Sequence, residues 1–146
     1  MDDGPVTLQP ADDSLPYVEA LLDGAGLPSR DVRESSGWFY VGYVDGERVG
    51  VGGIEPYGTD GLLRSVVVEP AARGRGLGTA LCAALEAEAR AVGVDTLYLL
   101  TTTAAPFFAA RGYDAIDRTE PPAAIQRTTE FDDLCPTTAT CMRKRL

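Results

Sequence analysis

The sequence predicts an α+β fold in a single domain that covers residues 1–146. The length of 146 residues suits one domain with a core of its own. Short runs rich in β-branched and aromatic residues, which are typical of strands, are interspersed with segments whose apolar residues recur at helical spacing. Between two of these runs stands Asp45-Gly46, a pair that favours a tight hairpin and therefore antiparallel pairing.

The chain opens with a predicted strand and a predicted helix. Residues 6–9 indicate a short strand. From Tyr17 to Leu22 the apolar side chains recur at helical spacing, which indicates a helix. Asp12 or Asp13 is placed to serve as its N-cap, because a side-chain oxygen there accepts hydrogen bonds from the first backbone N–H groups.

Three strands follow, joined by a hairpin and a loop. Aromatic and β-branched residues over 38–44 indicate one strand, and 48–54 forms the returning strand of the hairpin. Glycines inside the returning strand predict a bulge or the close approach of another backbone. The segment 56–61 predicts a loop, and the apolar run 62–68 predicts the next strand.

The second half of the chain alternates helices and strands. Leu77, Leu81 and Leu85 share one face of a predicted helix. Gly93 is suited to the C-cap of that helix. The remaining predicted elements are, in chain order, a strand over 96–100, a short helix over 104–111, a strand that begins at 113–116 and a final strand over 138–146.

Composition and charge exclude several classes of function. The chain has no histidine, and Cys82, Cys135 and Cys141 are too few and too scattered for a disulfide framework, so a zinc site and a Ser-His-Asp triad are excluded. The net charge of −9 argues against nucleic acid and anionic membranes as partners. No apolar run approaches the length of a membrane helix, and the first residues lack the pattern of a signal peptide, so we expect a cytoplasmic protein.

The strongest functional signal is the turn Arg73-Gly74-Arg75-Gly76-Leu77-Gly78, which joins the strand over 62–68 to a helix. Glycines leave backbone N–H groups uncovered, and the start of a helix offers N–H groups without partners and the positive end of its dipole. The arginines add local positive charge to an acidic chain. The turn therefore predicts a site for a phosphorylated cofactor; the alternative is a surface turn with incidental glycines.

Two other phosphate loops do not fit this turn. A Walker-type loop requires Gly-Lys-Ser/Thr, and the turn has no lysine. The dinucleotide fingerprint G-x-G-x-x-G directly follows its strand, whereas Gly74, Gly76 and Gly78 are spaced G-x-G-x-G and stand beyond 70–73. What fits is Arg-x-x-Gly-x-Gly, which begins at Arg73. That pattern is the acetyl-CoA signature of the GNAT superfamily of N-acetyltransferases, which the segment closely resembles.

The resemblance implies both the fold and the cofactor. The GNAT fold is a mixed, mostly antiparallel sheet of six or seven strands with helices on both faces, and its central strands, here 62–68 and 95–101, splay apart. Acetyl-CoA is the acetyl donor, no metal is expected, and the pantetheine arm pairs with the backbone of the first of these strands. The residues that the resemblance places at the cofactor are Val66, Val67, Val68, Arg73, Gly74, Arg75, Gly76, Leu77, Gly78, Thr79, Thr101 and Phe108.

Further motifs narrow the resemblance and imply a class of substrate. LLRS, LLTTTAAPFFAARGY and TTEFDDLCP look like segments of the N-acetyltransferases found in arsenic-resistance operons. This implies acetylation of the amine of a small molecule in detoxification, such as an arsenical or phosphinothricin-like amino acid. A protein or peptide N-acetyltransferase and a non-catalytic CoA-binding sensor remain as alternatives. Dimers through terminal strands are common in the fold, so the resemblance allows a homodimer, although nothing in the sequence itself indicates one.

The usual catalytic side chains of the family are absent. Its glutamate base corresponds to Leu62 and its tyrosine proton donor to Phe108. Glu55, at the end of the neighbouring strand, is therefore the candidate base, with an exposed carboxylate as the alternative. Arg64 is a candidate for binding an anionic group of the substrate, unless it reaches solvent from the sheet edge. Tyr57 is a candidate for binding or orienting the substrate, or else a packed loop tyrosine.

The connection over Thr119–Pro136 is longer than is usual before a last strand. Long connections in compact domains are often functional. We expect Thr128 or Thr129 to cap a short helix there and the segment to cover the acceptor site; a packed surface element or a dimer contact is the alternative. Within it, Cys135 is either a reactive thiol or a small buried apolar residue.

Overall fold

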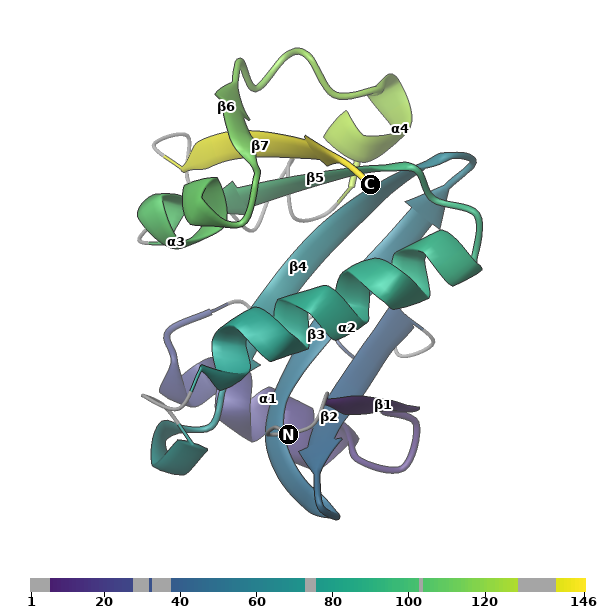
Figure 1. Cartoon of the computed structure of the whole chain (residues 1–146). Coiled ribbons are helices and arrows are strands. Elements are labelled where there is room, and N and C mark those ends of the chain that lie inside the picture. Colours follow the sequence, from purple (N-terminus) through teal and green to yellow (C-terminus); the bar gives the residue numbers. More distant parts are fainter. Residues whose placement is uncertain (1–5, 28–31, 33–37, 73–75, 103, 129–138) are drawn as a thin grey trace. The chain divides into compact units, whose positions relative to one another are not determined.

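The computed structural model describes residues 6–27, 32, 38–72, 76–102, 104–128 and 139–146. Its strands are hydrogen-bonded in the order β1-β2-β3-β4-β5-β7-β6, and along the chain they are joined by helices and by turns (Figure 1). The strands are β1 (Thr7–Pro10), β2 (Phe39–Val44), β3 (Glu47–Tyr57), β4 (Asp60–Val68), β5 (Thr96–Thr101), β6 (Asp114–Ile116) and β7 (Thr140–Arg145). The helices are α1 (Leu15–Gly24), the 3-10 helix η2 (Pro70–Ala72), α2 (Leu77–Ala91), α3 (Ala105–Ala110) and α4 (Ala123–Gln126). This order confirms the predicted α+β fold.

The pairing of the strands is mixed and mostly antiparallel, as predicted. β1 with β2, β2 with β3, β5 with β7 and β6 with β7 pair antiparallel, whereas β4 and β5 pair parallel. The parallel register joins Asp60–Leu62 to Thr96–Tyr98. β4 continues to Val68 and β5 to Thr101, and the predicted splay of the two strands beyond this register stays a prediction.

The chain divides into two compact units. The first comprises Met1–Ile54 and Ser65–Glu88, and the second comprises Glu55–Arg64 and Ala89–Leu146. Each unit has a cluster of buried apolar side chains of its own. The division does not test the prediction of a single domain over 1–146, which stays a prediction.

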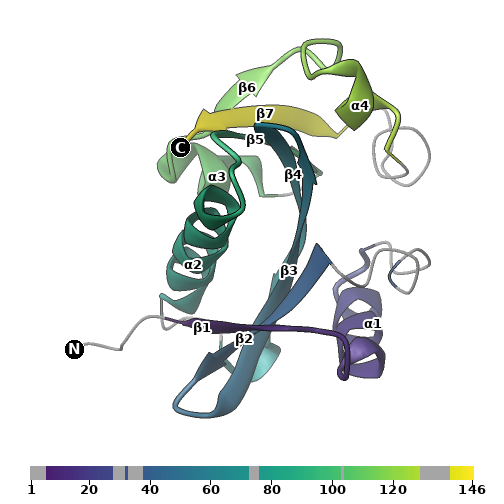
Figure 2. The ribbon, with the colours of Figure 1, turned by 90° about the vertical axis from the view of Figure 1, so that its right-hand side faces the viewer.

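In the first unit, the strands β2 and β3 have one apolar face that packs against α1. Phe39, Val41 and Val51 are almost fully buried in a cluster with Val18 and Leu22 of α1. Figure 2 shows α1 and α2 on opposite sides of these strands. Successive residues of a strand point to opposite faces. The residues that alternate with these apolar side chains along β2 and β3 therefore point away from α1 and toward α2.

Glycines form the part of the sheet that faces α2. A Cβ atom added to Gly50 would lie 2.4 Å from the carbonyl oxygen of Val67. One added to Gly52 would lie 2.5 Å from Cδ1 of Leu85 in α2. The register of β2 against β3 also shifts between Gly42 and Tyr43, which makes a bulge in the hairpin. The predicted close approach is therefore present at Gly50, and a bulge is present beside it, with Val49 as the extra residue.

In the second unit, the core joins strand residues to α4. Its members come from β4, β5, β7, α4 and the residue before β7: Leu62, Tyr98, Leu100, Ile125, Ala139 and Cys141. Tyr57 and Ile116 pack against this cluster and are partly buried. The second unit therefore has its own packed face, to which the end of β3 contributes a side chain.

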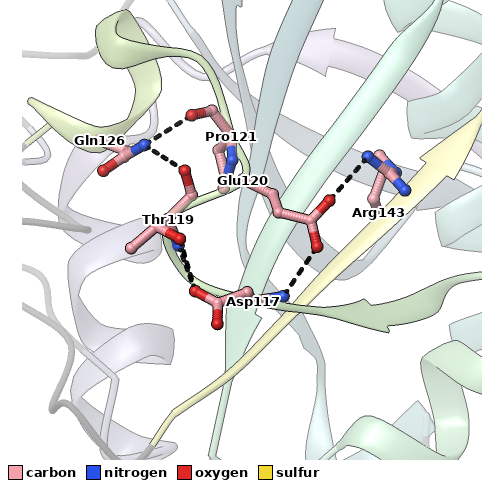
Figure 3. Close-up of polar contacts among 6 residues, drawn as sticks. All are labelled: Asp117, Thr119, Glu120, Pro121, Gln126 and Arg143. Atoms are coloured by element: carbon pink, nitrogen blue, oxygen red, sulfur yellow. Dashed lines mark hydrogen bonds and ion pairs between the residues drawn. The ribbon is translucent and has the colours of Figure 1, made fainter.

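Polar contacts hold the connection between β6 and α4 (Figure 3). The hydroxyl and the backbone N–H of Thr119 both donate to Asp117, at 2.7 and 2.9 Å. The Gln126 amide donates to the backbone oxygen of Thr119 at 2.9 Å. Arg143 of β7 lies 3.7 Å from a carboxylate oxygen of Glu120. The described first part of the long connection is thus a folded element that leads into α4.

The prediction of a loop over 56–61 is wrong. β3 continues to Tyr57, and a turn at Gly58–Thr59, with Gly58 at a φ of 69°, leads directly into β4. Pro56 suggested a loop because proline cannot donate to a strand ladder. In the described residues the pairing of β3 with β2 ends at Gly53, before Pro56, so the proline interrupts no described hydrogen bond of that ladder.

The prediction for the cap of the first helix is also wrong. The N-cap of α1 is Ser14, and no side-chain hydrogen bond caps it. Asp12 and Asp13 are exposed residues before the helix. Pro16 lies in the first turn of α1, where its missing N–H removes no bond from the helix.

The predictions for the later part of the long connection lie largely outside the described residues. Thr128 follows α4, is buried, and donates to the carbonyl oxygen of Ile125 at 2.6 Å. Thr129 and Cys135 belong to the segment 129–138, which is not among the described residues. The predicted helix and the predicted cover over an acceptor site stay predictions.

Candidate active site

The three residues predicted on the substrate side come together at the end of β3 and in β4. Nη1 of Arg64 donates to Oε2 of Glu55 at 3.0 Å. The hydroxyl of Tyr57 donates to Oε1 of Glu55 at 2.8 Å. Glu55 and Tyr57 are two positions apart on β3, so they point to the same face, and Arg64 reaches them from the adjacent strand. All three belong to the second unit.

Burial excludes two of the alternatives weighed for these residues. Arg64 is 2% exposed and Glu55 4% exposed, so neither an exposed carboxylate nor an arginine that reaches solvent describes them. Tyr57 is half-buried, lies in a strand and packs against the second core, so it is not a loop residue.

The buried charges balance each other. Glu55 supplies a negative charge beside Arg64. A substrate anion is therefore not needed to balance this arginine, which weakens the prediction that Arg64 binds an anionic group of the substrate. A buried ion pair of this kind depends on both partners, because the loss of one leaves an uncompensated charge away from water. Burial, and next to it the hydrogen bond to Glu55, raise the pKa of Tyr57, so its phenol keeps its proton at neutral pH.

Glu55 has both carboxylate oxygens in hydrogen bonds to side chains of this unit. Each oxygen of a carboxylate accepts more than one hydrogen bond, so Glu55 keeps the chemical capacity to take a proton. Protonation would, however, remove the negative charge that Arg64 contacts at 3.0 Å, which opposes that role. The geometry therefore favours a structural or positioning role for Glu55 over that of a base.

The strand that is predicted to hold the cofactor contains an irregularity that sequence reasoning missed. Ser65 has a φ of 59°, a left-handed conformation that is unusual for a residue other than glycine. Such a residue turns a strand and redirects the N–H groups that follow it. Val67 is buried in the first core, and its neighbours Val66 and Val68 are half-buried. A serine carries no sequence signal for this conformation, so only the structure finds it.

The approach to the glycine turn is held in place in the first unit. The backbone N–H of Glu69 donates to the oxygen of Val49 at 2.8 Å, and the N–H of Ala72 donates to the oxygen of Glu69 at 2.9 Å. The Tyr17 hydroxyl donates to Oε2 of Glu69 at 2.7 Å, and Arg48 lies over the Tyr17 ring at 4.4 Å. The chain therefore leaves β4 in a defined direction.

The end of the turn and the start of α2 have the features expected of a phosphate site. Gly76 is exposed at a φ of 74°, and a Cβ atom added to it meets nothing within 4 Å, so the space beside it is open. α2 begins at the buried Leu77, and Gly78 and Thr79 follow in its first turn, where helix geometry leaves N–H groups without partners inside the helix. Three residues of the predicted turn lie outside the described part of the chain: Arg73, Gly74 and Arg75.

The last two predicted cofactor residues lie in the second unit, at and after the end of β5. Oγ1 of Thr101 accepts a hydrogen bond from the N–H of Ala104 at 2.9 Å, which orders the start of α3. Phe108 is 8% exposed, and its ring packs edge-to-face on Phe107 and Tyr113 at centroid distances of 5.2 and 5.5 Å. The ring of Phe108 carries no hydroxyl, so it donates no proton.

Two features are absent from the part of the chain that the structure describes. There, no three Cys, Asp or Glu side chains gather in a way that could hold a metal ion. Nor does any described helix combine the length and the apolar character that crossing a membrane requires.

Comparison with protein families gives one match. The model of the acetyltransferase (GNAT) domain matches residues 35–115, which is more than half of the chain. The matched segment runs from before β2 to within β6, and so includes Glu55, Tyr57 and Arg64 as well as the turn before α2. No curated protein matches the chain.

Several solved structures share the fold. N-acetylglutamate synthase from Neisseria gonorrhoeae, complexed with coenzyme A and L-arginine, matches with a TM-score of 0.81 and 22% identity over 98% of this chain, which spans about a third (34%) of that protein. Rv2747 from Mycobacterium tuberculosis, in a complex with CoA, matches with a TM-score of 0.78 and 24% identity, covering 96% of this chain and 99% of that one. PaiA N-acetyltransferase from Thermoplasma acidophilum, complexed with coenzyme A, matches with a TM-score of 0.67 and 12% identity, covering 98% and 100%. At these identities the likeness shows the fold.

Proposed function

The chain belongs to the GNAT acetyltransferase family, and from this membership we propose that it transfers the acetyl group of acetyl-CoA to the amine of a small molecule. The observation that carries the proposal is the segment from β4 to α2. It combines an irregular strand, an exposed glycine in a left-handed turn and a helix start, all within the residues that the family model matches.

We propose that the cofactor is bound by the residues that the sequence predicts. The backbone at Val66–Val68 would pair with the pantetheine arm, and the N–H groups from Gly76 to Thr79, with Arg73 and Arg75, would hold the phosphates. The open space at Gly76 supports this assignment, because a phosphate must approach the backbone closely there. Three solved proteins of the same fold were crystallised with coenzyme A, which agrees with the assignment of a CoA site.

The reaction needs a neutral amine, N–H donors for the thioester carbonyl and a proton for the leaving thiolate. Bound acetyl-CoA would supply the acetyl group as a thioester. The redirected N–H groups that follow Ser65 are proposed to stabilise the charge that develops on the carbonyl oxygen. The sequence predicts Glu55 as the proton acceptor, but its pairing with Arg64 opposes that role, so water is proposed to take the proton of the acceptor's ammonium group. With Phe108 in place of a tyrosine, the thiolate is proposed to take its proton from water.

For the acceptor, we propose a small amine that carries an anionic group, with arsenical and phosphinothricin-like amino acids as the first compounds to try. Arg64 is the residue that the sequence predicts for this group, and an acceptor anion would share its guanidinium with Glu55, to which Nη1 donates. A protein or peptide acceptor and a CoA sensor without turnover remain the competing functions. The cytoplasmic location and the homodimer also stay predictions.

Calorimetric titration of acetyl-CoA into the protein tests the cofactor site, at low and at high salt. Saturable binding is expected for the wild type, and the Arg73→Ala/Gly76→Asp variant is expected to lose it, because an aspartate in the turn repels phosphate and blocks the approach to the backbone. Gly24→Ala, at the end of α1, serves as a variant outside the turn and should bind like the wild type. A folded wild type that binds no acetyl-CoA in either salt would contradict the proposed function.

A further inference from the structure

We propose that Tyr17 of α1 is a positioning residue for the cofactor. By holding Glu69, it fixes the start of the phosphate turn, the name used here for residues 73–78, which is proposed to bind the phosphates of acetyl-CoA. This inference rests on the proposed acetyltransferase function. The contacts that carry it, of Tyr17, Arg48, Glu69 and the start of α2, all lie within the first unit.

Glu69 stands between the sheet and the phosphate turn. β4 ends at Val68, and η2 (Pro70–Ala72) follows Glu69 directly. The phosphate turn begins with the next residue, Arg73. The direction in which the chain runs at Glu69 therefore decides where the phosphate turn starts relative to the strands of the first unit.

Three elements hold Glu69. Its backbone N–H donates to the oxygen of Val49 in β3 at 2.8 Å, and its backbone oxygen accepts from the N–H of Ala72 at 2.9 Å. The second of these bonds closes a turn, because Ala72 stands three positions after Glu69. Oε2 of Glu69 accepts the hydroxyl of Tyr17 at 2.7 Å. The side-chain bond therefore ties to α1 a turn that its backbone bonds tie only to β3 and to itself.

Tyr17 is itself held in place. Its ring packs against the core of the first unit, and the guanidinium of Arg48 lies 4.4 Å from the centre of that ring. Burial, and next to it the hydrogen bond to Glu69, raise the pKa of Tyr17, so the phenol keeps its proton at neutral pH and donates it to the carboxylate. A fixed ring thus offers its proton at a fixed place, and the Glu69 carboxylate is positioned by it.

The other end of the phosphate turn is held by α2. The oxygen of Gly76 accepts from the N–H of Ala80 at 3.3 Å, and Leu77, the first residue of α2, is 4% exposed. Three residues separate Ala72 from Gly76, so the path between them depends on where both ends are held. A loop that is held close to its binding conformation loses less entropy when a ligand binds, which raises the affinity. The bond between Tyr17 and Glu69 is expected to act on the cofactor in this way.

The alternative is that the bond between Tyr17 and Glu69 only stabilises the packing of α1. Both residues line a cavity of about 400 Å³, which has room for water, and Glu69 is half-buried. Loss of the hydroxyl therefore leaves the carboxylate to water and costs little stability. A loss of stability also leaves the Kd of the folded protein unchanged, because only the unfolded fraction weakens the apparent binding. The Kd of a folded variant therefore distinguishes the two roles.

Calorimetric titration of acetyl-CoA, well below the Tm of each variant, tests the proposal. Tyr17→Phe is expected to raise Kd about fivefold, the value of one hydrogen bond. Glu69→Asp keeps the charge but shortens the side chain by one methylene, so it should raise Kd to a similar extent. The double variant should be no worse than either single variant, because the hydroxyl acts through the carboxylate. With an amine that the wild type acetylates, KM for acetyl-CoA should rise by the same factor in Tyr17→Phe, and kcat should stay unchanged.

Tyr40→Phe is the matched control, because it removes another half-buried hydroxyl of the first unit that donates to a glutamate, Glu88, at 3.3 Å. It should leave Kd unchanged. Thermal melts show whether each variant folds, and if Tyr17→Phe does not, the Kd of Glu69→Asp decides alone.

Two results would overturn the inference while the wild type binds acetyl-CoA. One is a folded Tyr17→Phe that binds as tightly as the wild type. The other is a double variant whose losses add, because the hydroxyl would then act without the Glu69 carboxylate. A wild type that binds no acetyl-CoA contradicts the proposed function itself.

Discussion

Replacing Gly50 with alanine tests whether the glycine face of the first unit lets α2 pack closely on the sheet. The added Cβ would lie 2.4 Å from the carbonyl oxygen of Val67, 3.0 Å from Cδ2 of Leu81 and 3.2 Å from Cα of Val68. Two of these three atoms belong to the backbone of β4, which cannot turn away as a side chain can. The neighbouring strand must therefore shift.

Overpacking of this kind costs about 1–3 kcal/mol, and the backbone contacts place Gly50→Ala at the upper end, about 2–3 kcal/mol. Alanine recovers about 0.4–1 kcal/mol of this through the lower entropy of the unfolded chain. The net loss of roughly 2 kcal/mol lowers Tm by about 4–8 °C in a chain of this size. Urea denaturation and thermal melts followed by circular dichroism measure both quantities.

Two other glycines calibrate the measurement. At Gly52 the contact, 2.5 Å, is with the end of the Leu85 side chain, which can rotate, so Gly52→Ala should cost less than Gly50→Ala. Gly24, the last residue of α1, has nothing within 4 Å of an added Cβ, and alanine there should raise the free energy of unfolding by up to about 1 kcal/mol. The reasoning would be refuted if Gly50→Ala were as stable as the wild type, or if Gly52→Ala cost more.

Three further predictions concern charge, thiol chemistry and the ligand. Glu55→Ala should lower the free energy of unfolding in urea by about 3–5 kcal/mol, because it removes the carboxylate that lies beside the buried charge of Arg64. When Glu55 and Arg64 are both replaced by methionine, the free energy of unfolding should lie within about 2 kcal/mol of the wild-type value. Equal losses in the two variants would contradict this. Burial raises the pKa of Cys141 from 9.0 to about 11, so the free energy of unfolding should fall as the pH rises from 9.0 to about 11, and the slope should be smaller in Cys141→Ser; identical slopes would contradict it. Acetyl-CoA at about a hundred times its Kd should stabilise the wild type by about 2.7 kcal/mol in a thermal melt, and no shift would count against binding.

Features set by neighbouring residues could be predicted from the sequence. Asp45 and Gly46 predicted a hairpin, and both have the positive φ, 52° and 82°, that such a turn requires. The leucine spacing from Leu77 predicted α2, and Gly93, at a φ of 94°, follows its last turn as expected. These signals succeed because each depends on a few consecutive residues.

Partners that are distant along the chain could not be predicted. Glu55 and Arg64 were each singled out, but nothing in the pattern indicated that one is the counter-charge of the other, because Pro56 suggested that β3 had already ended. The Tyr17 hydroxyl and Glu69 are 52 positions apart, and no periodicity connects them. Their contact depends on how α1 packs against the end of β4. The left-handed φ of 59° at Ser65 also depends on tertiary packing and not on its neighbours in the sequence.

The most direct test of the central claim is steady-state transfer of the acetyl group. The protein is mixed with acetyl-CoA and a panel of small amines, arsenical and phosphinothricin-like amino acids included, and the CoA thiol and the N-acetylated product are measured together. We predict that at least one amine gives equal amounts of both, and that Arg73→Ala/Gly76→Asp abolishes the signal. A folded protein that binds acetyl-CoA but releases no more thiol with any amine than without one would contradict the account and would leave a CoA sensor in its place.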